Sequence, residues 1–546
     1  MDGAISGQIA VGRYLLQVGE PSGAVVHEAS RAERAHIRPR PTPIVLRPKL
    51  IRGLLDRRSE LALALSALDA SLPIEASGEP GIGKTAILRQ LAYHSRATAF
   101  VDGIVYLTAR NLSSDDLLQL IFEAFNESDE PCKPTSAEIR RGLQEKQALI
   151  LIDDVHLKQD ELERVLDIAP QSAFAISTRE RCLWGEVRSL PLKGLPVEHA
   201  VLLLEREIER PLDATERASA ASLCAAVDGH PLRIVQAAAI IRERGISLGG
   251  WALDITPEIL VTELLASIDE KQRRVLLALT ALGGVPLKVQ HISGIAEVTD
   301  IESSMMALVR QGLVVGSQSS PRLADGVADR LRRMEDLKPW VNRVITYFTA
   351  WAERHRRSPD VLLEESEALL RVQQCAADAR RWGEVLLLGR LLEGPLVLGV
   401  RWGAWAITLE RCLAAAKAIG DRAAEAWALH EIGTRALCVG NSGRARAVLG
   451  QAVKLRESLQ DEVAAAASRR NLSLVVAAVS EDSSERSTMP PSVVRGIDSL
   501  PLRDAVQSAA PDPKAPGVMV LAFTGVLFAI VGWFAYLAVA AALIRP

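Results

Sequence analysis

Several features of common protein classes are missing from this 546-residue sequence. Its six cysteines lie far apart and form no C-x-x-C pair, which excludes a zinc ribbon or redox pair and argues against a secreted disulfide framework. A large excess of positive or negative charge is also missing. With 64 Lys and Arg against 67 Asp and Glu, the net charge is -3, so nucleic acid is not an expected partner. The N-terminus has no basic stretch before an unbroken apolar one, so no secretory signal is expected.

What the chain does have is enough apolar sequence for several packed domains. Hydrophobic residues make up 48% and charged residues 24%, a balance that excludes wholesale disorder. At roughly 150 residues per domain, the length predicts about three or four domains.

A long uncharged run stands near the C-terminus. Residues 515–544 carry no charged side chain, and about 20 apolar residues suffice to cross a bilayer as a helix. We therefore expect a transmembrane tail anchor at 515–546, after a disordered linker at 480–514 that is rich in Ser, Pro and Asp. Three basic residues before the run and one after it favour a single-pass membrane protein with a cytoplasmic body. A buried core helix is the alternative.

The strongest motif is G-E-P-G-I-G-K-T, which ends at Thr85 and fits G-x-x-x-x-G-K-[ST] in full. A strand-like segment precedes it and a helix-like segment follows. In such a loop Gly78, Gly81 and Gly83 let backbone N–H groups surround phosphate oxygens. Lys84 would reach the β- and γ-phosphates, and the Thr85 hydroxyl would bind Mg²⁺. ATP or ADP with Mg²⁺ is therefore the predicted cofactor.

Two further apolar runs predict parallel strands with polar groups at their carboxyl ends. The run at 148–152 leads to Asp153 and Asp154, and the run at 173–177 leads to Arg179. Asp153 would hold Mg²⁺, directly or through water, and Asp154 would orient or deprotonate an attacking water. Arg179 would sense the γ-phosphate, with a surface salt bridge as the alternative.

This order of motifs resembles the NB-ARC group of STAND signalling ATPases. The segment 54–61 resembles the entry motif of that family, and Arg57 is the counterpart of an arginine that lies near the nucleotide. Gly-His-Pro-Leu matches the G-x-P-L motif, which implies that Pro231 packs against adenine. The segment 322–325 corresponds to a Met-His-Asp-like motif, with Ala324 where the family has histidine.

An internal repeat follows the part that resembles this family. Gly403, Leu409 and Asp421 recur 40 residues later as glycine, leucine and aspartate, within a sequence of helical pattern. Paired-helix repeats of the tetratricopeptide (TPR) kind stack into a concave binding surface, and an irregular helical bundle is the alternative.

The N-terminal residues 4–27 are β-prone and nearly uncharged. The tetrad Leu16-Gln17-Val18-Gly19 resembles the core of RIP-homotypic-interaction-motif-like amyloid signalling segments, whose copies would stack in a cross-β arrangement. A β-hairpin docked on the body and plain disorder are the alternatives. Nucleic acid or anionic lipid could bind the basic residues that follow, but their proline spacing favours a linker.

The predicted fold class is an α/β P-loop NTPase with a parallel sheet, followed by a helical domain, a winged helix, TPR-like repeats and a single transmembrane helix. The expected domains are an amyloid-like motif at 1–30, a basic Pro-rich linker at 31–52, the P-loop domain at 53–205, a helical ARC subdomain at 206–256, a winged helix at 257–335, repeats at 336–479, a disordered linker at 480–514 and the tail anchor at 515–546.

These features together predict a nucleotide-switched ADP/ATP signalling ATPase with slow hydrolysis, if any. On activation it would oligomerise and signal through its N-terminal motif to an effector protein bearing a similar motif, for example in bacterial immunity or regulated cell death. Its C-terminal helix would contact the lipid bilayer. The alternatives are a membrane-perturbing effector acting through that helix and an ATP-dependent transcriptional regulator using the winged helix. An ABC-type transporter ATPase is excluded, because no L-S-G-G-Q-like signature occurs.

Overall fold

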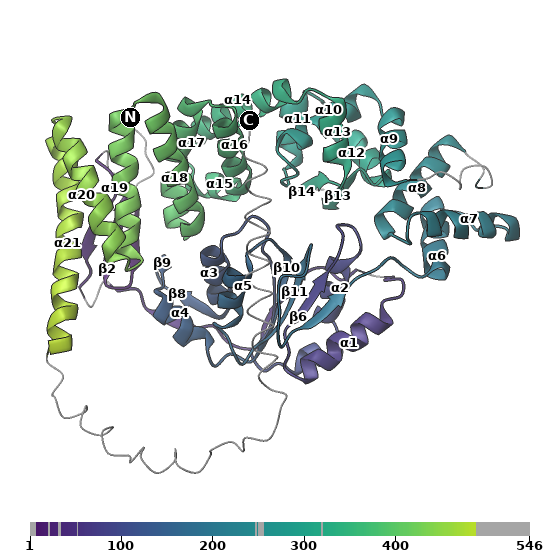
Figure 1. The fold of residues 1–546 in the computed structure, drawn as a ribbon, viewed down its shortest axis with the longest axis horizontal. Helices are drawn as coiled ribbons and strands as arrows, with labels where there is room; N and C mark the ends of the chain where they lie inside the picture. The colour runs from purple at the N-terminus through teal and green to yellow at the C-terminus, as the bar shows by residue number, and fades with distance from the viewer. Residues whose placement is uncertain are drawn as a thin grey trace, which may run out of the picture. The chain divides into compact units, whose positions relative to one another are not determined.

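The chain forms one compact unit up to Val479 (Figure 1). The computed structural model describes residues 7–19, 22–30, 34–51, 53–245, 248, 256–317 and 320–487.

A six-stranded parallel sheet, in the order β12-β6-β11-β10-β7-β5, is the centre of the P-loop domain, as the sequence predicts. The apolar run in β10 explains why both faces are covered. Leu149 and Leu151 pack on one face with α1 and α2, whereas Ile150 and Ile152 pack on the other with α3, α4 and α5. The strands and helices of this domain are β5 (Ile44–Leu46), α1 (Arg58–Asp69), β6 (Ile74–Ser77), α2 (Lys84–Ala92), η1 (Ser95–Ala99), β7 (Gly103–Thr108), α3 (Ser114–Phe125), α4 (Ser136–Leu143), β10 (Ala148–Val155), α5 (Gln159–Leu166), β11 (Ala173–Thr178) and β12 (Arg188–Pro191).

The order of the strands brings the predicted site residues to one edge of the sheet. Strand β11 lies between β6 and β10. Since all three are parallel, the P-loop after β6, Arg179 after β11 and Asp153 in β10 lie at the same, carboxyl end.

The segment predicted as a proline-rich linker is more ordered than expected. It contributes β4 (Ile37–Pro39), which pairs with β8 (Asn126–Ser128), and β5, which extends the central sheet beside β7. Gly103 makes the second pairing possible. At φ 100°, a Cβ there would lie 1.9 Å from the carbonyl oxygen of Ile44. The prediction of a linker was based on composition. The absence of a side chain at Gly103 lets the residues around Ile44 pair with β7 as a strand instead.

Two helical regions follow the P-loop domain. The first is a three-helix subdomain, and in the second five helices accompany a two-stranded hairpin, the content expected of a winged helix. Their elements are α6 (Val197–Ile208), α7 (Ala214–Ala226), α8 (Pro231–Arg244), α9 (Pro257–Ser267), α10 (Glu270–Ala281), α11 (Val289–Ala296), α12 (Ile301–Arg310), β13 (Val314–Ser317), β14 (Ser320–Leu323) and α13 (Val327–Met334).

Paired helices then form the predicted TPR-like repeats. Asp421 and Asp461 occupy the same place in successive copies, because each accepts a hydrogen bond from the N–H of the residue three positions later, at 2.9 and 3.0 Å. Helices α19 and α20 approach closely at Gly433, since a Cβ there would lie 2.6 Å from the Leu449 side chain. The helices of the repeat region are α14 (Lys338–Arg354), α15 (Pro359–Glu364), α16 (Ser366–Asp378), α17 (Trp382–Leu398), α18 (Trp402–Ile419), α19 (Arg422–Cys438), α20 (Ser442–Ser458) and α21 (Glu462–Ser487).

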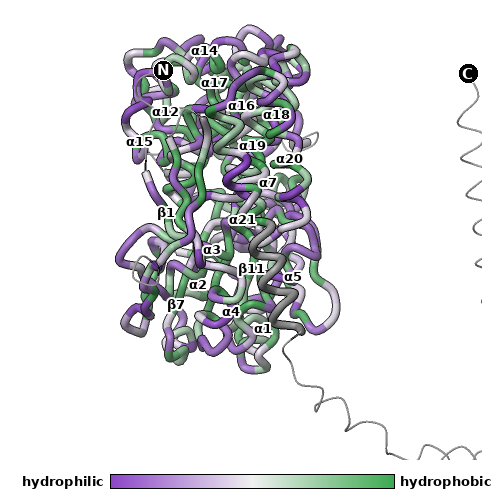
Figure 2. The backbone as a smooth tube through the Cα atoms, turned by 90° about the vertical axis from the view of Figure 1, so that its left-hand side faces the viewer, coloured by the Kyte–Doolittle hydropathy of each residue, from purple (hydrophilic) through white to green (hydrophobic). Residues whose placement is uncertain are grey.

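The N-terminal segment forms an antiparallel sheet of β1 (Gly7–Val11), β2 (Tyr14–Val18) and β3 (Val25–Glu28), which we call the N-terminal sheet. Its outer strand β1 also pairs in parallel with β9 (Cys132–Lys133) of the P-loop domain. The strands around β1 are largely hydrophobic (Figure 2), and Leu16 and Val26 are fully buried. This arrangement is the docked alternative, and the structure gives no support to an amyloid assembly.

The membrane-spanning part of the predicted fold class requires a correction. The expected span at 515–546 lies outside the described residues, as does the end of the linker before it, while α21 continues into that linker as far as Ser487. None of the helices that the structure describes is long and apolar enough to cross a membrane. The fold class is corrected to what the described residues show, a parallel-sheet P-loop domain followed by helical regions, and they give no support to the transmembrane helix or to the single-pass membrane localisation.

Candidate nucleotide-binding site

The P-loop has the backbone that its glycines predict. Gly78, Gly81 and Gly83 have φ values of 147°, 85° and 109°, a region that side-chain-bearing residues rarely adopt. Space is restricted as well, since a Cβ on Gly81 would lie 2.8 Å from the Cβ of Leu232. Helix α2 begins at Lys84, directly after the loop, so its N-terminal N–H groups face the space that a phosphate would fill.

Lys84 lies across this loop. Its Nζ donates hydrogen bonds to the carbonyl oxygens of Gly78 at 2.7 Å and Glu79 at 2.9 Å. Burial lowers the pKa of Lys84, and the nearby carboxylates of Asp153 and Asp154 oppose this effect. The ammonium is thus held at the mouth of the loop, where a phosphate would offer it oxygen ligands of opposite charge.

Asp153 and Thr85 lie together, as the predicted magnesium site requires. The Thr85 hydroxyl donates to Asp153 Oδ1 at 3.1 Å, and Ser177 and Tyr106 donate to the same carboxylate at 2.5 and 2.7 Å. Two oxygen ligands of the type that Mg²⁺ prefers are therefore adjacent. The part of the chain that the structure describes has no cluster of three or more acidic, His or Cys side chains suited to a metal. Nucleotide phosphates and water would have to complete the coordination of Mg²⁺.

Asp154 is held by two cationic or potentially cationic side chains. Arg110 Nε donates to Asp154 Oδ2 at 2.5 Å, and His156 Nε2 lies 3.0 Å from Oδ1. Burial alone would raise the pKa of Asp154, but the His156 hydrogen bond and the Arg110 charge outweigh it and hold the pKa well below its ordinary value. Because a carboxylate of low pKa is a weak base, this geometry favours orientation of a water over its deprotonation.

Arg179 and Pro231 both line the cavity above the P-loop. The Arg179 side chain is 60% exposed, and its guanidinium lies 3.9 Å from Asp325, a loose ion pair that leaves it able to turn toward a phosphate. Pro231 is the first residue of α8, beside Leu232, so an apolar surface is available to an adenine ring.

Arg57 does not line this cavity. It is 3% exposed and donates from one guanidinium nitrogen to the carbonyl oxygens of Ile82 at 3.0 Å and Lys193 at 2.7 Å. It also pairs with Glu60 at 2.8 Å. Arg57 therefore supports the P-loop from behind, through the carbonyl of a loop residue.

We expect Arg57→Ala to lower the free energy of unfolding by about 3 kcal/mol, because two carbonyl oxygens and the Glu60 carboxylate lose a buried donor. Urea unfolding of the full chain measures this change. Arg58→Ala, at the exposed neighbouring position, should stay within about 0.5 kcal/mol of wild type. Equal urea midpoints for Arg57→Ala and Arg58→Ala would show that the hydrogen bonds of Arg57 do not stabilise the P-loop.

The cavity has a volume of about 830 Å³, in the range of small-molecule sites. Residues that motif analysis did not assign to the site also line it: Arg110 follows β7, Arg322 comes from β14, and Arg371 comes from helix α16 of the repeats. Burial, together with the Arg110 guanidinium, lowers the pKa of Arg322. The segment 322–325 thus lies at this cavity, and it brings an arginine two positions before Ala324.

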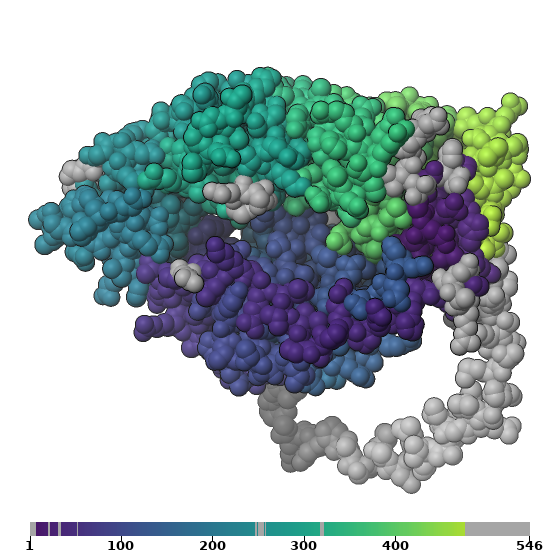
Figure 3. Space-filling view, turned by 180° about the vertical axis from the view of Figure 1, so that it is seen from behind, coloured from purple at the N-terminus to yellow at the C-terminus, as the bar shows by residue number. Residues whose placement is uncertain are grey.

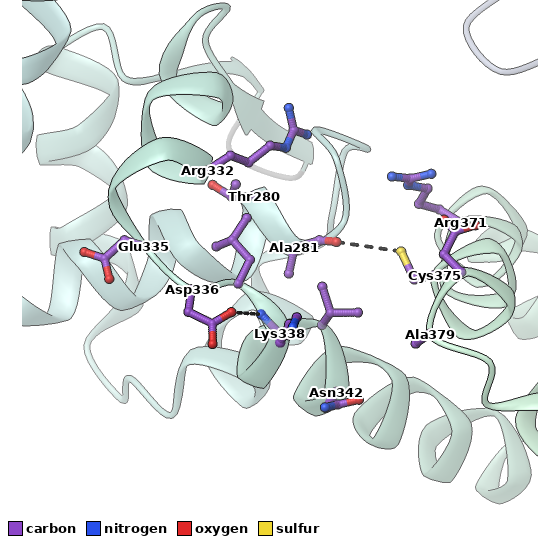
Figure 4. A pocket seen from close by; sticks show the side chains of 13 residues that line it. Thr280, Ala281, Arg332, Glu335, Asp336, Lys338, Asn342, Arg371, Cys375 and Ala379 are labelled. Carbon is purple, nitrogen blue, oxygen red and sulfur yellow. Dashed lines mark hydrogen bonds between the residues drawn. The ribbon is translucent and has the colours of Figure 1, made fainter. Parts of the chain in front are cut away.

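Arg371 also borders a second cavity of about 700 Å³, between the hairpin region and the repeats. Figure 4 shows Arg332 from α13 and Arg371 from α16 at this cavity, with Cys375 directed at the carbonyl oxygen of Ala281, 3.7 Å away. Arg332 and Arg371 line both cavities, so the nucleotide site and the junction with the repeats share side chains.

Comparisons with known proteins agree with this geometry at the level of the domain. Residues 71–177 match a family described as an AAA domain. A STAND (signal transduction ATPase with numerous domains) protein with a tetratricopeptide repeat sensor from Pyrococcus horikoshii is 16% identical, over 82% of this chain and 83% of that one, with a TM-score of 0.41. A Walker-type ATPase of Pyrococcus abyssi is 15% identical, over 53% of this chain and 100% of that one, with a TM-score of 0.29. No curated protein matches.

The two solved structures are too distant to carry an argument about function, so the conclusion rests on the site and the domain match. Glycines at positive φ, a lysine across the loop and an adjacent Thr85–Asp153 pair are the features that hold nucleotide phosphates in such domains. Residues 71–177 therefore form a P-loop domain that matches the AAA family, and its fold implies nucleotide binding.

Proposed function

We propose that this chain is a nucleotide-switched signalling ATPase of the STAND type. One observation carries the proposal: four regions of the chain contribute to a single nucleotide cavity. Lys84 comes from the P-loop domain, Pro231 from the three-helix subdomain, Arg322 from the hairpin region and Arg371 from the repeats. A nucleotide bound there would lie among all four of these regions.

The difference between ADP and ATP would act through the arginines of this cavity. The γ-phosphate adds negative charge next to Arg179 and Arg322, which belong to different regions. A ligand shifts a conformational equilibrium only by its difference in affinity for the two states. In this proposal ADP favours the closed arrangement, and ATP gains affinity from an arrangement in which these arginines reach the γ-phosphate.

A clamp between the repeats and the P-loop domain would define the closed arrangement. The buried carboxylate of Asp116 in α3 accepts hydrogen bonds from the N–H groups of Gly403 and Ala404, both at 2.9 Å, at the N-terminus of α18. A carboxylate at that end of a helix is favoured by the helix dipole. Asn111 donates to Glu367 at 2.8 Å across the same interface. Opening would break these contacts and free surface for self-association.

Signalling through the N-terminal segment to an effector with a similar motif is also part of the proposal. Such signalling would require the N-terminal sheet to leave the body, because Leu16, Val18 and Val26 are buried in it. Release would expose a β-prone segment of low charge, the kind of sequence that pairs between chains.

Identification of the nucleotide that co-purifies with the full chain tests the proposal, with ADP as the expected result. Asp153→Asn should lose the part of ATP affinity that depends on Mg²⁺, about 10-fold or 1.4 kcal/mol, because the metal loses an anionic ligand. Binding of ATP without metal should be unchanged. Asp160→Asn, an exposed carboxylate on α5, is the matched control for titrations with and without Mg²⁺. An undiminished Mg²⁺ effect in Asp153→Asn would contradict the metal assignment.

A further inference from the structure

Strand β3 is the edge strand of the N-terminal sheet. Side chains of the repeats bind main-chain groups on its unpaired side, including those of Ala24 just before the strand. Glu431 accepts from the N–H of Ala24 at 2.8 Å, and Asn471 Oδ1 accepts from the N–H of Val26 at 3.0 Å. The Ala24 carbonyl oxygen accepts from Asn471 Nδ2 at 2.9 Å and lies 2.8 Å from His430 Nε2. An edge strand normally leaves these groups to water or to another strand. Here the helices α19 and α21 take the place of that strand.

Successive repeats supply successive contacts. Glu431 and Asn471 are 40 residues apart, so they hold the same position in two copies of the repeat. Ala24 and Val26 are two residues apart, and their N–H groups therefore lie on the same edge of an extended chain. The equivalent position in α17 is Leu391, which has no hydrogen-bonding group, so the site spans two repeats.

The polar side chains of this site are fully buried, and His430 and Asn471 also bond to other side chains of the repeats. His430, Glu431 and Asn471 each have 0% exposure. His430 Nδ1 lies 3.0 Å from the Ser468 hydroxyl, and Asn471 Nδ2 also donates to Thr434 at 2.8 Å. Burial lowers the pKa of His430 to about 4, so its ring is neutral and Nε2–H donates to the Ala24 carbonyl oxygen.

Such a cluster costs stability unless its groups are satisfied, and an apolar core would cost less. The presence of this cluster against main-chain groups of Ala24 and Val26 points to recognition rather than to packing.

The site also selects by shape. Gly23 has φ 100°, and a Cβ there would lie 2.6 Å from both Glu431 Oε1 and His430 Cδ2. A glycine is therefore required at this position. Ala24, the next residue, is 1% exposed, so the site encloses its small side chain.

We propose that the inner face of α19 and α21 is a binding site for an extended peptide segment that carries glycine followed by a small residue. The chain's own Gly23–Val26 fills the site in this structure, where the N-terminal strands lie against the last helices of the repeats (Figure 3). An external segment of the same chemistry binds when the internal one leaves. This inference does not depend on the nucleotide switch, because none of its residues lines the nucleotide cavity.

The test uses the full chain with Gly23→Val, which displaces the internal segment, and a labelled peptide of residues 22–30. Fluorescence anisotropy should show binding at least 10-fold tighter than to wild type, where the tethered segment competes at high effective concentration. The same peptide with valine in place of its glycine should not bind. Gly443→Val, at a glycine with free space around it, is the control and should bind as weakly as wild type.

Two further measurements use Asn471→Ala, and the first of them does not require Gly23→Val to fold. Asn471→Ala in the otherwise wild-type chain should speed hydrogen exchange of the Val26 amide at least 10-fold. Adding Asn471→Ala to a folded Gly23→Val chain should weaken peptide binding at least 10-fold. The proposal is overturned if the Gly23→Val chain folds and does not bind the peptide of residues 22–30. It is also overturned if that chain binds this peptide and its valine variant with equal affinity, or if Asn471→Ala leaves the Val26 amide protected from exchange.

Discussion

Lys84→Ala is expected to weaken the binding of both ATP and ADP about 100-fold, a loss of about 2.7 kcal/mol. The ammonium already lies across the loop, on the carbonyl oxygens of Gly78 and Glu79, so no rearrangement of the chain is needed for it to meet a phosphate. We expect alanine to remove the charge and leave the fold intact, because the lysine is only half-buried. Isothermal titration of the full-length protein measures the change.

Thermal unfolding gives an independent readout of the Lys84 prediction. A ligand at 1,000 times its Kd stabilises the folded state by about 4.1 kcal/mol, and a 100-fold weaker ligand at that concentration stabilises it by only about 1.4 kcal/mol. Lys158→Ala, an exposed lysine at the start of α5, should keep the full stabilisation. Equal stabilisation of the Lys84 and Lys158 variants by ATP would remove the basis for the P-loop assignment.

Asp116→Ala should open the contact between the repeats and the P-loop domain. The carboxylate is 2% exposed and receives two N–H groups of α18 as well as the Ser113 hydroxyl at 3.0 Å. Its loss leaves the N–H groups of Gly403 and Ala404 unpaired and removes a carboxylate from the environment of the buried Lys133. Leaving a buried N–H group without its acceptor costs about 1–3 kcal/mol. Exchange of the Gly403 and Ala404 amides should accelerate at least 100-fold.

The neighbouring carboxylate provides the matched control for Asp116→Ala. Asp115 is exposed and lies 3.5 Å from Arg435, a surface pair that contributes little. Asp115→Ala should change the same amide exchange rates less than 3-fold. In the proposed switch, Asp116→Ala also speeds release of bound ADP, whereas Asp115→Ala does not. Slow exchange in both variants would mean that the clamp does not hold the two regions together.

The central sheet and the P-loop were predictable because local sequence determines them. An unbroken apolar run such as that of β10 is buried on both faces wherever it occurs, and its C-terminal Asp153 then has a fixed place. The glycines of the loop carry their own backbone requirement. The repeats were predictable for a similar reason, because an offset of 40 residues places Asp421 and Asp461 at equivalent helix starts.

Other parts of the site depend on tertiary packing that local sequence does not encode. Arg371 looks like a surface residue of a helix, and only the packing of the repeats brings it to the nucleotide cavity. Arg57 shows the converse. Its motif implied a place near the nucleotide, yet its guanidinium bonds to carbonyl oxygens behind the loop.

The N-terminal segment shows why one pattern can support two opposite predictions. Alternating apolar residues such as Leu16 and Val18 suit a strand in a stack of copies and a strand docked on a body equally well. The choice lies with Glu431 and Asn471, more than 400 residues away, which bind the edge that another copy would have used.

The N-terminal sheet is attached unequally to its two neighbours. Toward the P-loop domain it has a parallel ladder of two residue pairs, Ala10 with Cys132 and Val11 with Lys133. Toward the repeats it has buried hydrogen bonds to two helices and an apolar core. If the domains separate, the short ladder breaks first, and the sheet remains with the repeats. Opening would therefore uncover an unpaired strand edge on each side of the gap, one at β1 and one at β9, before the N-terminal segment itself is free.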